Sequence, residues 1–400
     1  MNKPTTCDIF CAVIDNFGDI GVCWRLARQL AHEHAMTVRL WVDDLSSFRR
    51  LHSAICPEIP IQHCLGVEIR HWNLTYGEHS FAQVEPAQLV IEAFACKLPE
   101  CYEAAMAAQA CKPIWINLEH LSAEDWVIGC HCLPSPHPFL PLTKYFFFPG
   151  FVPQTGGLLL ESDLIKRRDA FQSELHKQAK FWHALGVPLA KPDEIRISLF
   201  CYENTMLPEL FDAWATGNTP ILCLVPEGRV LPQVAIFFGR EIIVTGDTLR
   251  HGNLEVRVLP FVEQDQYDEL LWACDINFVR GEDSCVRAQW AAKPFVWHIY
   301  PQQDGAHIDK LNAFMRLYCA GLEPSVAQAL HGLWERWNIW QNGDQAIPTN
   351  LKQVWDGYWK YQAALQRHAC AWSQYLSGNN LALNLLNFAR KIDRMHNSEY

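Results

Sequence analysis

The sequence has no apolar run long enough to cross a bilayer, and its N-terminus lacks the basic and apolar segments of a secretion signal. These absences predict a soluble, cytoplasmic protein with no membrane partner. Basic residues are also scarce, since 33 Lys and Arg stand against 44 Asp and Glu, for a formal net charge of −11. Because a phosphate backbone needs a basic surface, this balance argues against nucleic acid as a partner and favours a basic one.

Cysteines are plentiful, but they lack the spacing of a structural or metal-binding framework. The 16 cysteines form no C-x-x-C pair, and many lie inside apolar runs, as Cys11 and Cys201 do. This pattern predicts buried free thiols in a reducing compartment. Residues 130–132 (Cys-His-Cys) with His137 come closest to a metal cluster, yet their spacing matches no common zinc pattern. The sequence therefore predicts no metal site.

The loop that follows the apolar segment 9–14 lacks the third glycine of a dinucleotide-binding fingerprint, because only Gly18 and Gly21 are present. It joins a short strand to an amphipathic helix, a connection that binds ligands in open α/β sheets. The loop carries Asp15 and Asp19, which suit a phosphate poorly but suit a cationic or protic substrate as general base and orienting group. Helix capping is the alternative role for Asp19, since Asp is a favoured N-cap residue.

Short apolar strands alternate with helical segments through both halves of the chain. Strands are expected at 9–14, 38–42, 89–92, 114–117, 145–148, 195–201, 221–225, 242–244, 255–259, 276–279 and 295–298. This alternation indicates parallel sheets, and two such sets in 400 residues indicate two Rossmann-like domains with a ligand cleft between them. Beyond residue 350 the pattern is helical. The expected parts are an N-terminal domain at 1–158, a linker helix region at 159–190, a C-terminal domain at 191–368 and helices at 369–400 that pack back on the N-terminal domain.

A second informative stretch lies near residue 280. A strand is expected to end there, Gly281 makes a turn, and a helix is expected to begin at Asp283 and Ser284. The free N–H groups at the start of that helix, together with Arg280, predict a binding site for a nucleotide diphosphate. Glu282 is a candidate functional residue, with helix capping as its alternative.

Aromatic side chains near the expected strand ends could hold a nucleotide base. Tyr202, Phe261, Tyr267 and Tyr300 are the candidates, and Gln264 is expected to hold the base or ribose with them. Each aromatic residue taken singly could instead be part of a hydrophobic core.

Residues 15–22 and 280–290 together resemble the EarP family of protein-arginine rhamnosyltransferases, and residues 117–126, 144–151 and 155–157 match it as well. The resemblance extends to about Pro301, and in general layout to the end of the chain. It implies an α/β GT-B fold, in which two Rossmann-like, doubly wound parallel-sheet domains face a central cleft. It also implies an inverting transfer of L-rhamnose from dTDP-β-L-rhamnose to an arginine of translation elongation factor P, which activates that factor for the rescue of polyproline-stalled ribosomes.

The resemblance and the chemistry of the residues agree on a mechanism. A guanidinium has a pKa above ~12, so it must be oriented and must lose a proton as the new bond forms. Asp19 is expected to be the general base, Asp15 to grip the guanidinium, and Glu282 to orient the donor or the arginine. Arg280 and the helix start take up the charge of the departing dTDP, so no metal or cofactor is expected. The remaining substrate-binding residues are expected to be Asn16, Phe17, Gly18, Gly281, Asp283 and Ser284.

Two alternatives remain open on the sequence. One is a GT-B glycosyltransferase with a small-molecule or lipid acceptor, although no basic or apolar membrane-facing helix supports a lipid. The other is a non-catalytic protein that binds a nucleotide sugar, which would tolerate loss of Asp15 and Asp19.

Overall fold

The structure is a computed structural model that describes residues 4–14, 17–72, 81, 84–302, 305–338 and 350–398. The chain divides into two compact units, one of Met1–Ser162 with Leu376–Tyr400 and one of Asp163–Tyr375. Most of the segment expected as a linker therefore belongs to the second unit, which also extends beyond the expected boundary at 368.

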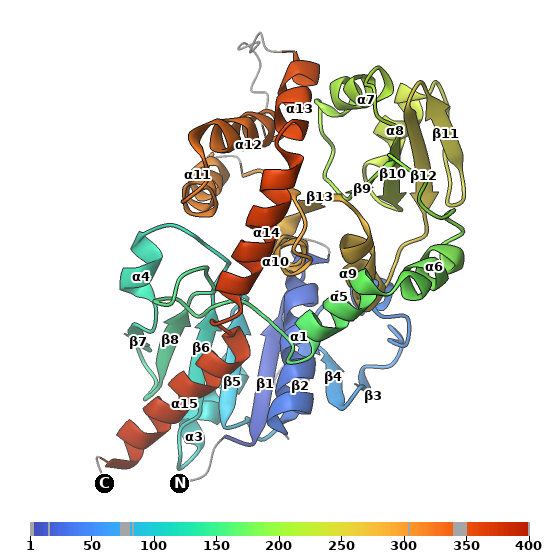
Figure 1. Ribbon diagram of the computed structural model, residues 1–400. Coiled ribbons are helices and arrows are strands. Elements are labelled where there is room, and N and C mark those ends of the chain that lie inside the picture. The colour runs from blue at the N-terminus through green and yellow to red at the C-terminus, as the bar shows by residue number, and fades with distance from the viewer. Residues whose placement is uncertain are drawn as a thin grey trace. The chain divides into compact units, whose positions relative to one another are not determined.

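The first unit is built on an eight-stranded sheet with the order β3-β4-β2-β1-β5-β6-β8-β7 (Figure 1). Its strands are β1 Thr6–Cys11, β2 Thr37–Val42, β3 Ile61–Cys64, β4 Val67–His71, β5 Leu89–Ala93, β6 Ile114–Leu118, β7 Pro134–Pro136 and β8 Thr143–Phe147. The sheet is parallel from β4 to β8, and the short edge strands β3 and β7 are antiparallel to their neighbours. The chain builds outward from β1 through β2 to β4 and then returns to β5 on the other side. The strand order therefore reverses between β1 and β5, the place where doubly wound sheets bind ligands.

Helices of the first unit flank this sheet. They are α1 Gly18–His34, α2 Leu45–Leu51, α3 Glu100–Ala108, α4 Trp126–Cys130 and α15 Leu381–Ser398. Helix α15 comes from the far end of the chain and packs against α1 and β6. Its start is fixed by two backbone hydrogen bonds, from Leu158 N to Asn379 O (3.1 Å) and from Leu381 N to Leu158 O (2.9 Å).

Strand β1 is held rigidly because its side chains are packed and hydrogen-bonded. Phe10 stacks on Trp41 of β2 with ring centroids 5.3 Å apart. The carboxylate of Asp8 is fully buried and accepts a hydrogen bond from Trp41 Nε1 (3.1 Å) while it pairs with Arg39. A buried carboxylate is tolerated only when it is paired in this way. The loop that follows β1 therefore starts from a fixed point.

The second unit is built on a six-stranded sheet with the order β11-β12-β10-β9-β13-β14. Its strands are β9 Ile195–Leu199, β10 Ile221–Pro226, β11 Thr248–His251, β12 Leu254–Leu259, β13 Ile276–Arg280 and β14 Phe295–His298. All neighbours are parallel except β11 and β12. Here the strand order reverses between β9 and β13, so the loops after these two strands mark the expected ligand site of this unit.

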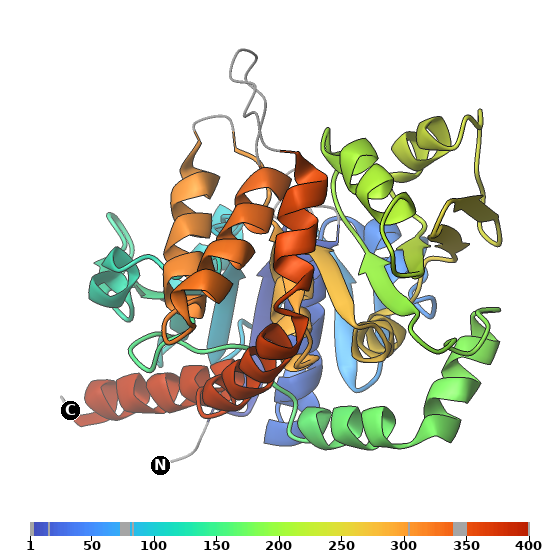
Figure 2. The ribbon, with the colours of Figure 1, turned by 45° about the horizontal axis from the view of Figure 1, so that its top comes forward.

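The helices of the second unit are α5 Leu164–Ser173, α6 Leu175–Ala184, α7 Leu207–Ala215, α8 Leu231–Phe237, α9 Gln264–Ala273, α10 Gly281–Trp290, α11 Ala306–Tyr318, α12 Pro324–Trp337, α13 Leu351–Trp359 and α14 Gln362–Leu376. The last residue of α14, Leu376, belongs to the first unit. Helices α11, α12 and α13, orange to red in Figure 2, lie beside one another. Phe314 of α11 stacks on Trp334 of α12 with ring centroids 5.8 Å apart. No helix in the described ranges is long and apolar enough to span a membrane.

Two sequence expectations about these elements are wrong. Residues 242–244 form no strand, and Ile242 is 75% exposed, while the strand of this region is β11, which starts at Thr248. Helix α10 begins at Gly281 with Arg280 as its N-cap, two residues before the expected start at Asp283. Strands β3, β4 and β7 are additions that the apolar pattern did not indicate.

Candidate active site

The acidic loop of the first unit connects β1 to α1. Asp15 and Asn16 lie outside the described residues. Phe17 is the N-cap of α1 and makes no side-chain capping hydrogen bond, whereas Asp19 is 6% exposed and its Oδ2 accepts a hydrogen bond from Ile14 N at 2.8 Å. The side chain of Asp19 therefore reaches back into the loop instead of serving as the N-cap. Gly18 is the first residue of the helix.

Residues that follow the neighbouring strands β2 and β4 hold this loop through hydrogen bonds. Val13 N donates to Asp43 Oδ1 at 2.8 Å, and Trp72 Nε1 donates to Cys11 O at 3.1 Å. Burial raises the pKa of Asp43, which follows β2. The ring of Phe17, an expected substrate-binding residue, lies 5.5 Å from the guanidinium of Arg50 on α2. The loop backbone is thus fixed on both sides of its undescribed residues.

A second loop at the same edge of the sheet follows β5, the neighbour of β1. Phe94, Ala95 and Lys97 have φ angles of 56°, 53° and 58°, a left-handed conformation that is uncommon for residues other than glycine. Ala95 N donates to Asn117 Oδ1 at 3.1 Å, which ties this loop to the 117–126 segment. Backbone strain of this kind concentrates at functional sites. The sequence pattern gave no signal for it.

Ionisable groups gather in that region. Burial, with the nearby Glu92, raises the pKa of Glu119, and burial raises the pKa of Glu103. Glu92 itself is 1% exposed and accepts a hydrogen bond from Lys144 Nζ at 3.0 Å. His120 stacks on Phe94 with ring centroids 4.7 Å apart. Buried and partly buried carboxyl groups thus gather at the edge of the sheet that carries Asp19.

In the second unit, Arg280 ends β13 and its guanidinium lies on two aromatic rings. Its central carbon is 4.5 Å from the ring centroid of Phe200 and 4.7 Å from that of Tyr202, both of which follow β9. Arg280 is 6% exposed, and its Nη1 is buried with no hydrogen-bond partner among the described residues. Cation–π contacts hold the guanidinium in place while leaving its N–H donors available to a ligand.

The structure brings most of the expected donor-binding residues together around this guanidinium. Tyr202 packs against Tyr300 at 5.5 Å between ring centroids, and Tyr267 of α9 packs against Phe200 at 5.6 Å. Gln264 Nε2 lies 3.4 Å from Asp283 Oδ2. Ser284 Oγ donates to the carbonyl oxygen of Arg280. Phe261 is half-buried in the segment that joins β12 to α9.

Helix α10 points its N-terminus at the same place. Arg280 is its N-cap and Gly281, with a φ of +65°, its first residue. The first-turn N–H groups of a helix have no partner within the helix, and they carry its positive dipole end. A guanidinium at the N-cap of a helix makes an anion site suited to a diphosphate.

Glu282, in the first turn of α10, forms an ion pair with Lys310 of α11. The distance from Lys310 Nζ to Glu282 Oε1 is 2.7 Å, and each side chain is 20% exposed. Nothing in the sequence pattern pointed to Lys310, Phe200 or Asp43. Their signal was weak, because each acts through a contact with a residue distant in sequence.

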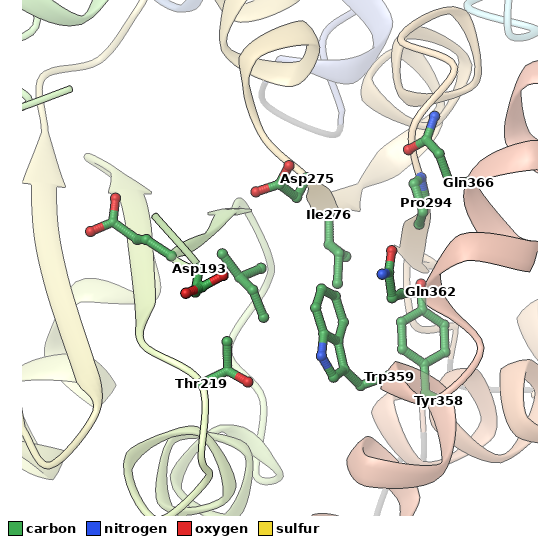
Figure 3. A pocket seen from close by; sticks show the side chains of 11 residues that line it. Asp193, Thr219, Asp275, Ile276, Pro294, Tyr358, Trp359, Gln362 and Gln366 are labelled. Carbon is green, nitrogen blue, oxygen red and sulfur yellow. The ribbon is translucent and has the colours of Figure 1, made fainter. Parts of the chain in front are cut away.

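A pocket of about 440 Å³ lies at the opposite edge of the second sheet (Figure 3). Asp193, Asp275 and Pro294 come just before β9, β13 and β14, and Trp359 of α13 forms its wall. The pocket lies at the amino ends of the strands, whereas Arg280 and its neighbours lie at the carboxyl ends. None of the expected site residues lines it. In the described parts of the chain, no group of three or more His, Cys, Asp or Glu residues could hold a metal ion.

Each unit has a mostly parallel, doubly wound sheet with ligand loops at the point where its strand order reverses, as in the GT-B fold of glycosyltransferases, and comparison with solved structures agrees. A glycosyltransferase from Rickettsia africae, 10% identical, covers 100% of this chain and 99% of its own, with a TM-score of 0.52. A structure that describes EarP-mediated arginine glycosylation of translation elongation factor EF-P is 36% identical, covers 96% of this chain and 99% of its own, and has a TM-score of 0.68. The expected fold class is confirmed.

Sequence comparison identifies the family to which the chain belongs. Residues 7–390 match the model of EarP, the elongation factor P (EF-P) rhamnosyltransferase. The protein-arginine rhamnosyltransferase of Pseudomonas putida is 47% identical over 96% of this chain and 98% of its own length. The protein-arginine rhamnosyltransferase of Shewanella oneidensis is 40% identical over 96% of this chain and 97% of its own length. The chain belongs to the EarP family of glycosyltransferases, as its motifs predicted.

Proposed function

We propose that this protein transfers L-rhamnose from dTDP-β-L-rhamnose to an arginine side chain of translation elongation factor P. The observation that carries the proposal is the 47% identity to a protein-arginine rhamnosyltransferase over 96% of the chain. The ligand loops described above support it, since one unit carries a buried carboxylate and the other a guanidinium at a helix start.

The reaction follows from the chemistry of these groups. A guanidinium nitrogen attacks the anomeric carbon of rhamnose from the face opposite to the diphosphate, so the configuration inverts. The bond from that carbon to the diphosphate oxygen breaks, and its electron pair leaves with dTDP. Asp19 accepts the proton that the arginine nitrogen loses, and Arg280 with the N-terminus of α10 stabilises the charge on dTDP. Asp15 is proposed to grip the guanidinium, and Glu282 to orient the donor or the arginine.

Mass spectrometry of elongation factor P after incubation with this protein and dTDP-β-L-rhamnose tests the proposal. We expect one deoxyhexose to be added to a single arginine. A factor that stays unmodified while a different acceptor gains the sugar would point to another GT-B transferase.

The donor is expected to bind without a metal ion, because Arg280 and the helix start already supply positive potential to the diphosphate. Calorimetry of dTDP binding to the parent protein should give the same affinity in the presence and in the absence of a chelator. Binding that is lost with the chelator and returns with magnesium would show that the diphosphate needs a metal ion here.

Phe261 is proposed to stack on the thymine base. Losing such a stacking ring costs ~1–3 kcal/mol, so Phe261→Ala should weaken dTDP roughly tenfold or more. Phe139→Ala is the matched control, because that ring is 92% exposed in the first unit and should not matter. If Phe261→Ala folds and binds dTDP like the parent, the ring only packs against its neighbours.

A further inference from the structure

His298 is the last residue of β14, directly beside Arg280 on the neighbouring strand. The two residues are paired in the parallel register of β13 and β14. Both contact Tyr202: the histidine ring centroid lies 5.2 Å from that of Tyr202, edge to face, and the guanidinium carbon lies 4.7 Å from it. The imidazole and the guanidinium therefore both contact the ring of Tyr202 at the carboxyl edge of the sheet.

Each of these two side chains has a buried polar atom without a hydrogen-bond partner in the described parts of the chain. The atoms are Nη1 of Arg280 and Nδ1 of His298, and the residues are 6% and 8% exposed. Buried polar groups in proteins are hydrogen-bonded with few exceptions, and an exception calls for a specific explanation. These two adjacent exceptions lie at the carboxyl ends of β13 and β14, next to the point where the strand order reverses, and one polar ligand bound there explains both.

The histidine is neutral in this position. Burial, then the charge of Arg280 and then His307, lower the pKa of His298 to about 3. A neutral imidazole has one N–H donor and adds no second positive charge beside the guanidinium. It can therefore donate a hydrogen bond to an anionic oxygen without the repulsion that a protonated ring would meet.

We propose that His298 is a further donor-binding residue, whose imidazole N–H donates a hydrogen bond to a diphosphate oxygen of the nucleotide sugar next to Arg280. The inference rests on the proposed function in one respect, that the donor is a nucleoside diphosphate sugar. A diphosphate is the part of such a donor that offers anionic acceptors to a guanidinium and an imidazole side by side. Packing of His298 against Trp337, at 5.8 Å between ring centroids, holds the ring in this orientation.

Three substitutions test which part of the ring matters. His298→Asn keeps an N–H near the position of Nδ1, His298→Gln moves the amide toward the position of Nε2, and His298→Leu removes both. Loss of a hydrogen bond to a charged group should weaken dTDP about 10- to 100-fold in His298→Leu. Calorimetry should show that His298→Asn recovers most of this affinity and that His298→Gln does not.

Thymidine serves as a ligand that lacks the diphosphate. Its affinity, measured by ligand-observed NMR, should be the same for the parent and all three variants. Equal losses for thymidine and dTDP would overturn the proposal, because they would indicate a general disturbance of the site. Parent-like binding of dTDP by folded His298→Leu would also overturn it.

The outcomes separate this inference from the proposed function. If the parent itself fails to bind dTDP, the proposed donor is wrong. If the parent binds dTDP and no variant differs, only the role of His298 is wrong. Should His298→Leu fail to fold, the comparison of His298→Asn with His298→Gln decides, since equal dTDP affinities in those two variants would contradict a hydrogen bond from Nδ1.

Discussion

Asp19→Asn is expected to abolish rhamnosyl transfer while leaving the affinity for dTDP close to that of the parent. Asparagine keeps an oxygen that can accept the hydrogen bond from Ile14 N, which is 2.8 Å long in the parent, so the loop should keep its shape. It cannot accept a proton at neutral pH. General-base catalysis contributes about 10²–10⁴-fold, so turnover should fall by that factor. Steady-state rhamnosylation together with dTDP calorimetry measures both quantities.

The matched control is Asp44→Asn in the same unit. Asp44 is the N-cap of α2 and its Oδ1 accepts hydrogen bonds from Ser46 N and Ser47 N at 2.9 and 3.0 Å. Asparagine caps a helix about as well as aspartate, so this variant should keep parent-like turnover and thermal unfolding. If Asp19→Asn behaves like the control, Asp19 is a structural residue of the loop and another carboxylate is the base.

The fold could be predicted where a strand is fully buried and could not where it lies at an edge. β1 and β13 are buried strands, mostly apolar but with Asp8 and Asn277 inside them, and each is followed by a glycine-containing turn, a pattern that leaves few alternatives. Strand β3 alternates exposed and half-buried residues over four positions, and the five-residue β4 buries fully only Val67 and Ile69, so this hairpin carries little apolar signal. Residues 242–244 show the converse error. An apolar triplet predicts a strand, yet Ile242 and Val244 are 75% and 59% exposed in an irregular segment.

Some residues of the candidate site could be predicted from the sequence, and others could not. Motif residues that are contiguous in sequence, such as Arg280 and Ser284, could be placed from the strand, turn and helix around them. His298 could not, because its importance comes from the register that pairs it with Arg280. Asp43 supports the backbone of a loop 30 residues away through one hydrogen bond. A single sequence gives no strand register, and so it gives no such pair.

Helix capping was a reasonable alternative for Asp19, and the structure shows why position alone misleads. A helix that starts at Gly18 puts Asp19 in its first turn, where a carboxylate is favourable because of the helix dipole. The hydrogen bond to Ile14 N then holds the side chain against the loop. Asp19 thus stabilises the helix start and also presents a carboxylate in the loop that follows β1.

Arg280→Met is expected to weaken dTDP by about 100-fold or more. The guanidinium lies on Phe200 and Tyr202 at 4.5 and 4.7 Å, and methionine preserves much of that apolar packing while removing the charge and every donor. Charge-assisted hydrogen bonds contribute ~1.5–3 kcal/mol each, and one guanidinium can donate two such bonds to the same phosphate group. Arg280→Lys should fall between the parent and Arg280→Met, because it keeps the charge but loses the planar pair of donors.

The control for this substitution is Arg250→Met, since Arg250 on β11 pairs with Glu255 at 2.9 Å and is 67% exposed. Its affinity for dTDP should equal that of the parent, because an exposed ion pair contributes little to the structure. Calorimetry at fixed ionic strength measures all three variants, and thermal unfolding shows whether each is folded. If folded Arg280→Met binds dTDP as tightly as the parent, the guanidinium only packs the two rings together, and the diphosphate must bind through other groups. A loss confined to the Arg280 variants, with thymidine binding unchanged, would show that the guanidinium of Arg280 binds the diphosphate.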